Sequence, residues 1–201
     1  MNYVRIGLTG GPGCGKSAAR KIFSSFPGWI TFDADQICHE IYSEKNTPFA
    51  KILKSRWGEA VFNADGTPDR KAIAEKIFAD ETEREWLDSV LHPEIFFRLE
   101  NRTAQSCARF ILIEISLLFE VNWQTGMEQT IAVWSPPQLQ LARLLERGWT
   151  QEHAARRIAA QFPSQKKLEL ADYGIVNAGS LENLEEQCRR IDREIRTKFQ
   201  S

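Results

Sequence analysis

Short runs of apolar residues alternate along the chain with longer stretches in which apolar residues recur every three or four positions. A recurrence near 3.6 residues is typical of an amphipathic helix, whereas a short apolar run between turn residues is typical of a buried strand. The pattern therefore predicts five parallel strands that alternate with helices, in a three-layer α/β fold. The strands are predicted from residue 3 to the turn at Gly10, at 29–32, at 110–115, at 129–134 and at 173–176. The last predicted helix has an apolar stripe formed by Leu184, Cys188, Ile191, Ile195 and Phe199.

The turn after the first strand carries the strongest chemical signal. Gly10, Gly15, Lys16 and Ser17 fill the fixed positions of G-x-x-x-x-G-K-[ST], the phosphate-binding loop. Glycines let successive backbone N–H groups point inward, and the following helix adds the positive end of its dipole. We expect Lys16 to contact the β- and γ-phosphates of a bound polyphosphate and the Ser17 hydroxyl to bind magnesium.

Two stretches interrupt the alternation of strands and helices. Residues 36–108 show helical periodicity without a convincing strand and are too many for a simple crossover, so a helical insertion that holds a second substrate is predicted. The fourth predicted strand ends at Ser135-Pro136-Pro137, which predicts an N-cap at Ser135 and a proline in the first turn of a helix, and another helix is predicted to start near Thr150. The basic segment between the last two strands contains Arg143 and Arg147 at a spacing of four residues and extends to Lys166 and Lys167. Such charge runs are most often solvated faces, but beside a phosphate site they are typical of a lid that closes over the transferred group.

Acidic residues follow two of the predicted strands. Asp33 and Asp35 come after the second strand, and Glu114 lies near the carboxyl end of the third. Because ligands bind where parallel strands end, we expect these side chains near the glycine-rich loop. A buried carboxylate needs a cation or hydrogen bonds, which makes Glu114 a candidate metal ligand; a glutamate that reaches solvent is the alternative. One of the two aspartates could instead cap the next helix, predicted to begin near Gln36.

Composition excludes several classes of protein. The chain has 201 residues, 42% of them hydrophobic, which suits one globular unit with a full core. A net charge of −1 gives no overall attraction to nucleic acid or an acidic membrane surface, and no apolar run approaches the ~18 residues of a spanning helix. Met1 is followed by a predicted strand rather than a leader, so a cytoplasmic protein is expected. Four widely spaced cysteines fit neither a zinc site nor a disulfide framework and are expected to be free thiols.

Together, these motifs resemble those of the dephospho-coenzyme A kinase family, over nearly the whole chain. The matching segments are Gly7–Ser17 (GLTGGPGCGKS), Asp33-Ala34-Asp35, Asp65-Gly66 with Asp69-Arg70, Leu91-His92-Pro93, Leu117–Glu120, the arginine-bearing helix, Ala171-Asp172 and Asn177-Ala178-Gly179. The glycine-rich loop alone is shared by many kinases, but this set in this order is specific. The chain departs from the family pattern in three places: Ser116 replaces the usual proline, Ala18 replaces a frequent threonine, and the lid at Arg147-Gly148-Trp149 is one residue shorter and lacks the usual acid.

The resemblance implies a P-loop kinase fold and one reaction. That reaction is the ATP-dependent phosphorylation of the ribose 3′-hydroxyl of dephospho-coenzyme A, the last step of coenzyme A synthesis, with Mg²⁺ as cofactor and no nucleic-acid or membrane partner. The expected division is a nucleotide-binding core of residues 1–35, 109–142 and 171–201, an acceptor-binding insertion of residues 36–108 and a lid of residues 143–170.

The resemblance also implies roles for individual residues. The expected catalytic residues are Asp35 as the base, Lys16 and the lid arginine Arg143. The expected ATP-binding residues are Gly11, Pro12, Gly13, Cys14, Gly15, Lys16, Ser17, Ala18, Arg147, Asn177 and Gly179. The expected acceptor-binding residues are Thr9, Asp33, His92, Leu117, Leu118, Phe119 and Glu120. Ser17 and Glu114 are the expected magnesium ligands. On sequence grounds alone, a lone histidine such as His92 is more often a packed or capping residue.

Two other functions stay open at this point. Pro12 gives the loop a likeness to adenylate kinase, so a kinase for a nucleoside monophosphate or another small molecule is the first alternative. A non-catalytic nucleotide-binding module is the second, although such a module would have little use for Asp35 and Arg143 together. A GTP switch is disfavoured because no Asn-Lys-x-Asp stretch follows the third strand. A monomer or a weak homo-oligomer is expected.

Overall fold

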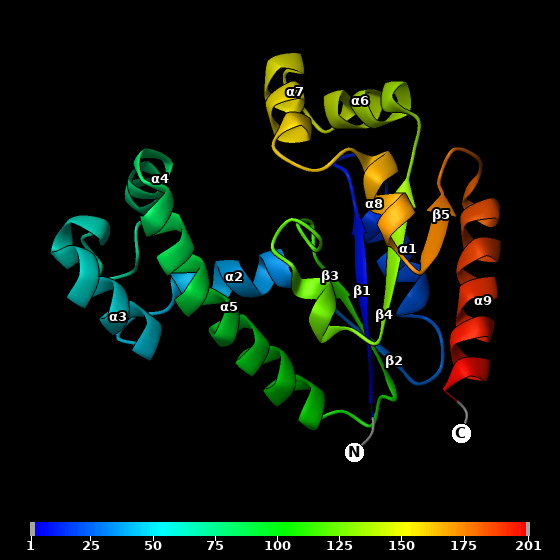
Figure 1. Cartoon of the computed structure of the whole chain (residues 1–201), viewed down its shortest axis with the longest axis horizontal. Helices are drawn as coiled ribbons and strands as arrows, with labels where there is room; N and C mark the ends of the chain where they lie inside the picture. The colour runs from blue at the N-terminus through cyan, green and yellow to red at the C-terminus, as the bar shows by residue number, and fades with distance from the viewer. Residues whose placement is uncertain (1–2, 200–201) are drawn as a thin grey trace. The chain divides into compact units, whose positions relative to one another are not determined.

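The computed structural model of the chain (Figure 1) describes residues 3–199, which divide into two compact units. The sheet unit contains residues 3–33 and 106–199, and the helical unit contains Ala34–Gln105. The limits predicted for the insertion, residues 36 and 108, lie within three residues of these boundaries. Residues 1, 2, 200 and 201 of the predicted core lie outside the described residues.

Five parallel strands form one sheet in the order β2-β3-β1-β4-β5. They are β1 (Val4–Gly10), β2 (Trp29–Asp33), β3 (Phe110–Glu114), β4 (Gln129–Trp134) and β5 (Tyr173–Val176). The prediction of five parallel strands is confirmed, although the third strand ends one residue earlier than predicted. In the register of β2 and β3, Asp33 is the partner of Glu114. Two carboxylates therefore lie side by side where these strands end.

One face of the sheet is covered by α1 (Lys16–Phe23) and α9 (Leu181–Lys198), which also contact each other. Strand side chains on this face, among them Ile6, Leu112 and Val133, are buried with residues of both helices in one apolar cluster. The predicted stripe of the last helix is confirmed, because Leu184, Cys188, Ile191 and Ile195 are buried and Phe199 packs against the cluster. Each large side chain buried here stabilises the fold by about 1.5–3 kcal/mol. The cluster thereby fixes α1 on the sheet.

The opposite face is covered by the segment after β3, which contains the short 3₁₀ helix η2 (Trp123–Gly126), and by α8 (Ser164–Leu170), drawn in front of β4 in Figure 1. Two glycines permit this close approach. A Cβ at Gly7 would lie 2.9 Å from Leu118 Cδ2, and a Cβ at Gly174 would lie 2.6 Å from Leu168 Cδ1. Larger residues there would push the covering layer away from the sheet. The sheet unit thus has the three layers that were predicted.

Two further helices, α6 (Pro137–Glu146) and α7 (Gln151–Ala159), follow β4. The predicted start of the second is confirmed, since the Thr150 side chain caps α7. The N-cap predicted for α6 at Ser135 is wrong. Pro136 takes the cap position, and the Ser135 hydroxyl lies instead within hydrogen-bond distance of the carbonyl oxygens of Cys14 and Asn177. A serine beside the glycine-rich loop therefore holds that loop rather than a helix end.

The helical unit consists of helices that coincide with the periodic segments of the sequence. They are α2 (Ala34–Ser43), α3 (Pro48–Trp57), α4 (Arg70–Ala79) and α5 (Glu81–Ala104), with the 3₁₀ helix η1 (Gly58–Val61) after α3. Thr47, Asp69 and Asp80 cap the starts of α3, α4 and α5 through their side-chain oxygens. The helix α2 begins at Ala34, earlier than the predicted Gln36, which puts Asp35 in its first turn.

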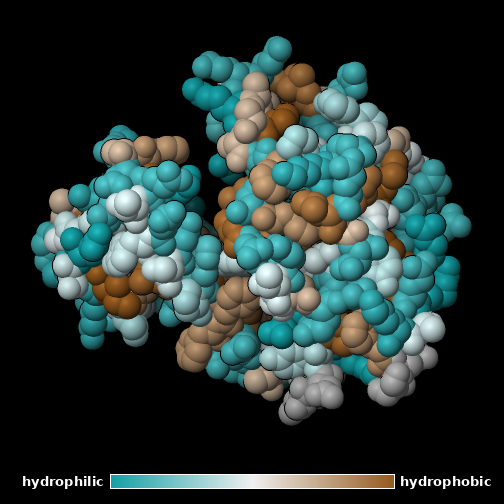
Figure 2. Space-filling model, viewed as in Figure 1, coloured by the Kyte–Doolittle hydropathy of each residue, from teal (hydrophilic) through white to brown (hydrophobic). Residues whose placement is uncertain are grey.

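Most of the surface visible in Figure 2 is hydrophilic, and its hydrophobic residues form only small patches. Among residues 3–199, none of the helices combines the length and the apolar character needed to cross a membrane.

The four cysteines are free, as predicted, and burial should separate their reactivity. Burial raises the pKa of Cys38 to about 11 and that of Cys188 to about 12, whereas Cys107 is exposed. Only the thiolate reacts, and three pH units below its pKa about one thiol in a thousand is ionised. We expect iodoacetamide at pH 8 to modify Cys107 at least ~100-fold faster than Cys38, as followed by peptide mass spectrometry. Equal rates in the folded protein would contradict the burial of Cys38.

Candidate active site

The glycine-rich loop joins β1 to α1 and has the backbone shape that its glycines allow. Gly13 and Gly15 have φ angles of 77° and 96°, and Gly15 stands at the N-cap of α1. Both positions are also crowded. A Cβ at Gly15 would lie 2.0 Å from Asn177 Nδ2, and a Cβ at Gly13 would lie 2.5 Å from the Gln140 carbonyl oxygen. These two positions thus require glycine for conformation and for space.

Side chains from the ends of β4 and β5 hold the loop by its carbonyl oxygens. Asn177 Nδ2 donates to the carbonyl of Cys14 at 2.9 Å. Arg143, from α6, donates to the carbonyl of Gly13 at 3.2 Å, to the Ser135 hydroxyl at 3.0 Å and to the carbonyl of Asn177 at 3.3 Å. The structure therefore brings the predicted residues Arg143 and Asn177 together at the loop. It engages the Arg143 guanidinium with three neutral acceptors, so contact with a transferred phosphoryl group requires some of these bonds to open.

The Lys16 side chain folds back onto carbonyl oxygens of the glycine-rich loop. Its Nζ donates to the carbonyl oxygen of Gly10 at 2.9 Å and to that of Gly11 at 3.4 Å. The ammonium group is thereby kept at the loop, where the first turn of α1 also begins. The predicted segment from Gly11 to Ala18 is one continuous turn-and-helix start, in which Ser17 and Ala18 are exposed.

Two carboxylates and an arginine lie beside the first turn of α1. Glu114 Oε1 accepts a hydrogen bond from the Ser17 hydroxyl at 3.3 Å, and its Oε2 accepts one from Arg20 Nε at 2.7 Å. The same guanidinium reaches Asp33 Oδ2 at 3.4 Å. Arg20 thus balances two adjacent carboxylates that would otherwise repel each other. Ser17 and Glu114, the two expected magnesium ligands, are therefore neighbours.

The electrostatics of Glu114 reflect its burial at the end of β3. Burial raises the pKa of this carboxyl group, and the neighbouring Asp33 raises it further, while Lys16 and Arg20 act in the opposite direction. Removing a carboxylate from water disfavours its charged form, and nearby cations favour it again. A cation added next to Glu114 would therefore stabilise the ionised side chain.

A buried ion pair lies on the other face of the sheet. Lys167, in α8, is fully buried; its Nζ lies 2.8 Å from Glu120 Oε1 and donates to Gln161 Oε1 at 3.0 Å and to the Ser116 carbonyl at 2.5 Å. The Thr9 hydroxyl donates to the same carbonyl at 3.4 Å. Burial lowers the pKa of Lys167, and the Glu120 carboxylate opposes this shift. The buried Glu120 Oε2 has no hydrogen-bond partner among residues 3–199.

The remaining acceptor-side residues differ in exposure. Leu118 is fully buried over Gly7 and belongs to the core, whereas Leu117 is 39% exposed and Phe119 is half-buried. Arg147 and Gly179 are both exposed, at the end of α6 and just before α9. Within this set, Leu117 and Phe119 therefore have surface available for a ligand.

The other predicted site residues, Asp35 and His92, lie in the helical unit. Asp35, Cys38 and Tyr42 are spaced along one face of α2. Asp35 raises the pKa of Cys38, and Cys38 and Asp88 raise that of Tyr42, although burial is the largest cause for both groups. His92 Nε2 lies 3.6 Å from Asp88 Oδ1, and burial lowers the pKa of this histidine. Asp35 and His92 thus lie on two helices of the same unit, α2 and α5.

Comparison with known proteins decides the family. A family model described as dephospho-CoA kinase matches residues 4–183. The chain belongs to the dephospho-CoA kinase family. It is 35% identical over 185 residues to the dephospho-CoA kinase of Thermosynechococcus vestitus, which covers 92% of this chain and 91% of the relative. The family assignment made from the sequence is therefore confirmed, and with it the assignment to the transferases.

Two solved structures agree with the fold. The crystal structure of TT1252 from Thermus thermophilus has a TM-score of 0.83 at 30% identity, covering 96% of this chain and 98% of that one. The dephospho-CoA kinase from Campylobacter jejuni has a TM-score of 0.64 at 26% identity, covering 95% and 96%. The P-loop kinase fold expected from the resemblance is thus confirmed in a dephospho-CoA kinase family member.

Several residues of this family member were missed by the sequence reasoning. Arg20 is one turn beyond the loop motif, and only the register of β2 and β3 shows that it meets Asp33 and Glu114. Lys167 was expected only as part of the basic lid segment, but it is buried. Asp172, part of a matching motif, accepts hydrogen bonds from the backbone and hydroxyl of Thr130, which joins the start of β5 to β4.

Breaking the buried pair should cost stability. Lys167→Met leaves the Glu120 carboxylate buried without its cation, so the free energy of unfolding in urea should fall by about 3–5 kcal/mol. Combining it with Glu120→Gln removes the unpaired charge and should recover part of the loss. The control is Lys166→Met, at the exposed neighbouring position. A loss of the same size in the control, or no recovery in the double variant, would contradict the pairing.

Proposed function

We propose that the chain transfers the γ-phosphoryl group of ATP to the ribose 3′-hydroxyl of dephospho-CoA, giving CoA and ADP. The observation that carries this proposal is the glycine-rich loop with Lys16 and the Ser17–Glu114 pair, in a chain that belongs to the dephospho-CoA kinase family. Because ATP is the donor, we expect the reaction in the cytoplasm. A monomer or weak homo-oligomer and the absence of nucleic-acid or membrane partners remain part of the proposal.

The loop residues perform the donor side of the reaction. Backbone N–H groups of residues 13–17, at the end of the loop and the start of α1, bind the phosphate oxygens, and the Lys16 ammonium stabilises negative charge on the β- and γ-phosphates. We propose that Asn177 and Gly179 border the adenine and that Arg147 contacts the nucleotide from the lid. Arg143 keeps the loop in shape through Gly13 and, when the lid closes, supplies positive charge to the transferred group.

Mg²⁺ fits the donor set beside Ser17. Magnesium prefers oxygen ligands and keeps several waters, so one hydroxyl and one carboxylate suffice when phosphate oxygens supply the rest. The Ser17 and Glu114 oxygens are 3.3 Å apart, close to the ~3 Å between neighbouring oxygens of an octahedral shell. No group of three or more His, Cys, Asp or Glu side chains suited to a metal occurs in residues 3–199, which agrees with a metal that arrives with the nucleotide. When bound, the ion would neutralise phosphate charge.

The acceptor side uses the carboxylates after β2. Asp35 accepts the proton of the 3′-hydroxyl, whose oxygen forms a bond to the γ-phosphorus as the bond to the β–γ bridging oxygen breaks. Asp33, held by Arg20, binds or orients the acceptor at the same end of the sheet. We propose that Thr9, His92 and the segment Leu117–Glu120 complete the acceptor site, with Leu118 and Glu120 acting through packing.

The test of this function is the mass of the product formed from dephospho-CoA, ATP and magnesium. The wild-type chain should add one phosphate, and NMR of the product should place it on the 3′ oxygen. The Lys16→Ala chain is the control, because it should keep its fold and lose turnover. Transfer to nucleoside monophosphates in preference to dephospho-CoA would overturn the proposal.

The variant Asp35→Asn should show which of the two aspartates, Asp35 or Asp33, is the catalytic base. The amide keeps the shape of the carboxylate but cannot take the proton, so kcat should fall by ~10²–10⁴-fold with little change in the KM for the acceptor. Asp33→Asn is the matched comparison and should act mainly by loosening Arg20. If steady-state kinetics gave Asp33→Asn the larger fall in kcat, the base would be the other carboxylate.

The variant Glu114→Gln should need more magnesium for activity than the wild type. Losing the charge beside Ser17 should raise the magnesium concentration for half-maximal velocity by roughly 10–100-fold, the usual range when a group supporting a metal is removed. Velocity should be titrated with magnesium at saturating ATP and acceptor. Glu128→Gln, which alters a carboxylate paired with Arg5, is the control and should leave the titration unchanged. An unchanged magnesium requirement in Glu114→Gln would remove Glu114 from the metal site.

A further inference from the structure

Residues 161–167, called the junction segment, connect α7 to α8 within the sheet unit. They pass beside the glycine-rich loop, because a Cβ at Gly11 would lie 2.9 Å from Ser164 Oγ. They also contact the stretch proposed for the acceptor, where the Phe162 N–H donates to Glu120 Oε1 at 2.8 Å. One short part of the chain therefore touches both the donor side and the acceptor side of the proposed site.

Lys167 links the junction segment to the chain after β3 through three hydrogen bonds. An ammonium group has three N–H donors, and this one has three acceptors: Glu120 Oε1 at 2.8 Å, Gln161 Oε1 at 3.0 Å and the Ser116 carbonyl at 2.5 Å. Glu120 belongs to the acceptor segment, residues 117–120, and Ser116 comes just before it, whereas Gln161 belongs to the junction segment. Because Lys167 is fully buried, water does not compete for these bonds. They fix the two segments to each other.

The Ser116 carbonyl is the point at which this link reaches the exposed part of the acceptor segment. Leu117, the next residue, is exposed and has surface available for a ligand. The Thr9 hydroxyl donates to the same carbonyl at 3.4 Å, and Thr9 immediately precedes the first glycine of the loop, Gly10. The peptide before Leu117 is thus held from two sides, by the strand that leads into the donor loop and by Lys167.

Stability alone does not explain a lysine at this position. Taking an ammonium group out of water is costly, and apolar side chains of similar volume in place of a buried ion pair are often neutral or stabilising. A methionine would fill similar space, but it would donate no hydrogen bond. What the lysine adds is the fixed direction of three bonds. Transfer between two bound substrates needs such precision, because a displacement of about 1 Å can slow a reaction ~100-fold.

We propose that Lys167 is a positioning residue for phosphoryl transfer, which together with Glu120 holds the acceptor segment in a fixed place relative to the glycine-rich loop. The proposal rests on the proposed function, because it takes the loop as the donor site and residues 117–120 as part of the acceptor site. Lys167 itself touches neither substrate. It determines where the acceptor hydroxyl lies relative to the γ-phosphorus, and it leaves the binding of ATP to the loop unchanged.

The test uses the double variant Glu120→Gln with Lys167→Met, which removes the bonds of the ammonium group. It leaves no unpaired buried charge and keeps the net charge, and the glutamine oxygen can still accept from Phe162. The rate of transfer to dephospho-CoA in a single turnover, with both substrates saturating, should fall roughly 10–100-fold. The dissociation constant for ATP, measured by calorimetry without acceptor, should stay within about twofold of the wild type.

The matched control is Thr130→Val, which breaks a buried hydrogen bond to Asp172 elsewhere in the sheet unit. It should lower the free energy of unfolding in urea and leave the transfer rate unchanged. Circular dichroism at the assay temperature shows whether each variant is folded. If the double variant is unfolded there, Gln161→Leu takes its place, because it removes one acceptor of Lys167 and keeps the ion pair. It should slow transfer at least ~3-fold without weakening ATP binding.

Three results would overturn the proposal. A transfer rate within about threefold of the wild type in the double variant, or an unchanged rate in its replacement, would leave Lys167 with a structural role alone. An equal loss of ATP affinity and of transfer rate would show that Lys167 acts through the glycine-rich loop. A fall of the same size in Thr130→Val would assign the effect to lost stability. Failure of the proposed function is a different result, because the wild-type protein would then form no CoA at all.

Discussion

The phosphate-binding site of the sheet unit depends on the hydrogen bonds that hold the carbonyl oxygens of Gly13 and Cys14. A phosphate-binding loop works only if its N–H groups keep one direction, and two glycines at positive φ give the loop little rigidity of its own. The direction is imposed from outside, by Arg143 and Asn177. These residues follow β4 and β5, so the order of the strands decides which side chains can reach the loop.

Strand register has the same importance for charge. Because Asp33 pairs with Glu114, the sheet puts two carboxylates next to each other, and Arg20 from the helix after the loop lies between them. Burial and like charge both raise the pKa of Glu114, so part of its ionisation is sustained by Lys16 and Arg20. A cation bound with a nucleotide would favour the ionised form of Glu114 and so lower its pKa again. Magnesium binding is thereby linked to the electrostatics of an already folded site.

Sequence reasoning predicted the strands, the last helix and the loop because each depends on local patterns: apolar runs, helical spacing and a fixed glycine motif. It did worse where contacts between distant segments decide the outcome. Ser135 looked like a helix cap, but the loop competes for its hydroxyl. Lys167 was expected only as part of a basic lid segment, but it is buried in an ion pair with Glu120, which lies 47 residues away in the sequence. Leu118 belongs to a matching motif, next to the exposed Leu117, but it is buried over Gly7, whose missing side chain leaves room for it.

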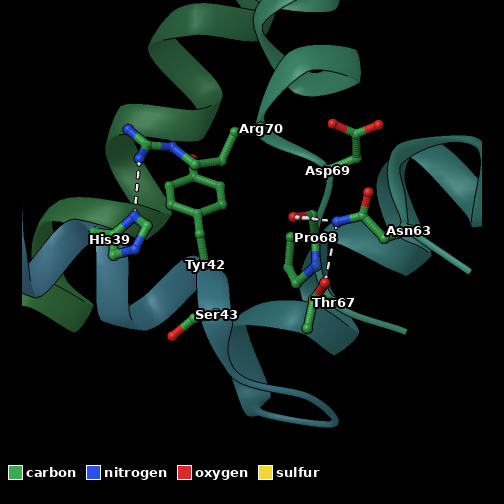
Figure 3. A pocket seen from close by; sticks show the side chains of 8 residues that line it. All are labelled: His39, Tyr42, Ser43, Asn63, Thr67, Pro68, Asp69 and Arg70. Atoms are coloured by element: carbon green, nitrogen blue, oxygen red, sulfur yellow. Dashed lines mark hydrogen bonds between the residues drawn. The ribbon is translucent and has the colours of Figure 1, made fainter. Parts of the chain in front are cut away.

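The arginines of the helical unit differ in whether they pair with a carboxylate. Arg98 pairs with Glu94 of the same helix, α5, and with Glu44, just after α2, so carboxylates of its own unit balance its charge. Arg70 differs from it, because the contacts of its guanidinium are with the His39 ring at 3.1 Å and the Tyr42 ring at 5.5 Å (Figure 3), and neutral partners stabilise a charge less than a carboxylate does. The sequence places Arg70 after Asp69 in a matching motif, but it cannot show which of the five arginines lacks a carboxylate, because that depends on how α2, α4 and α5 pack.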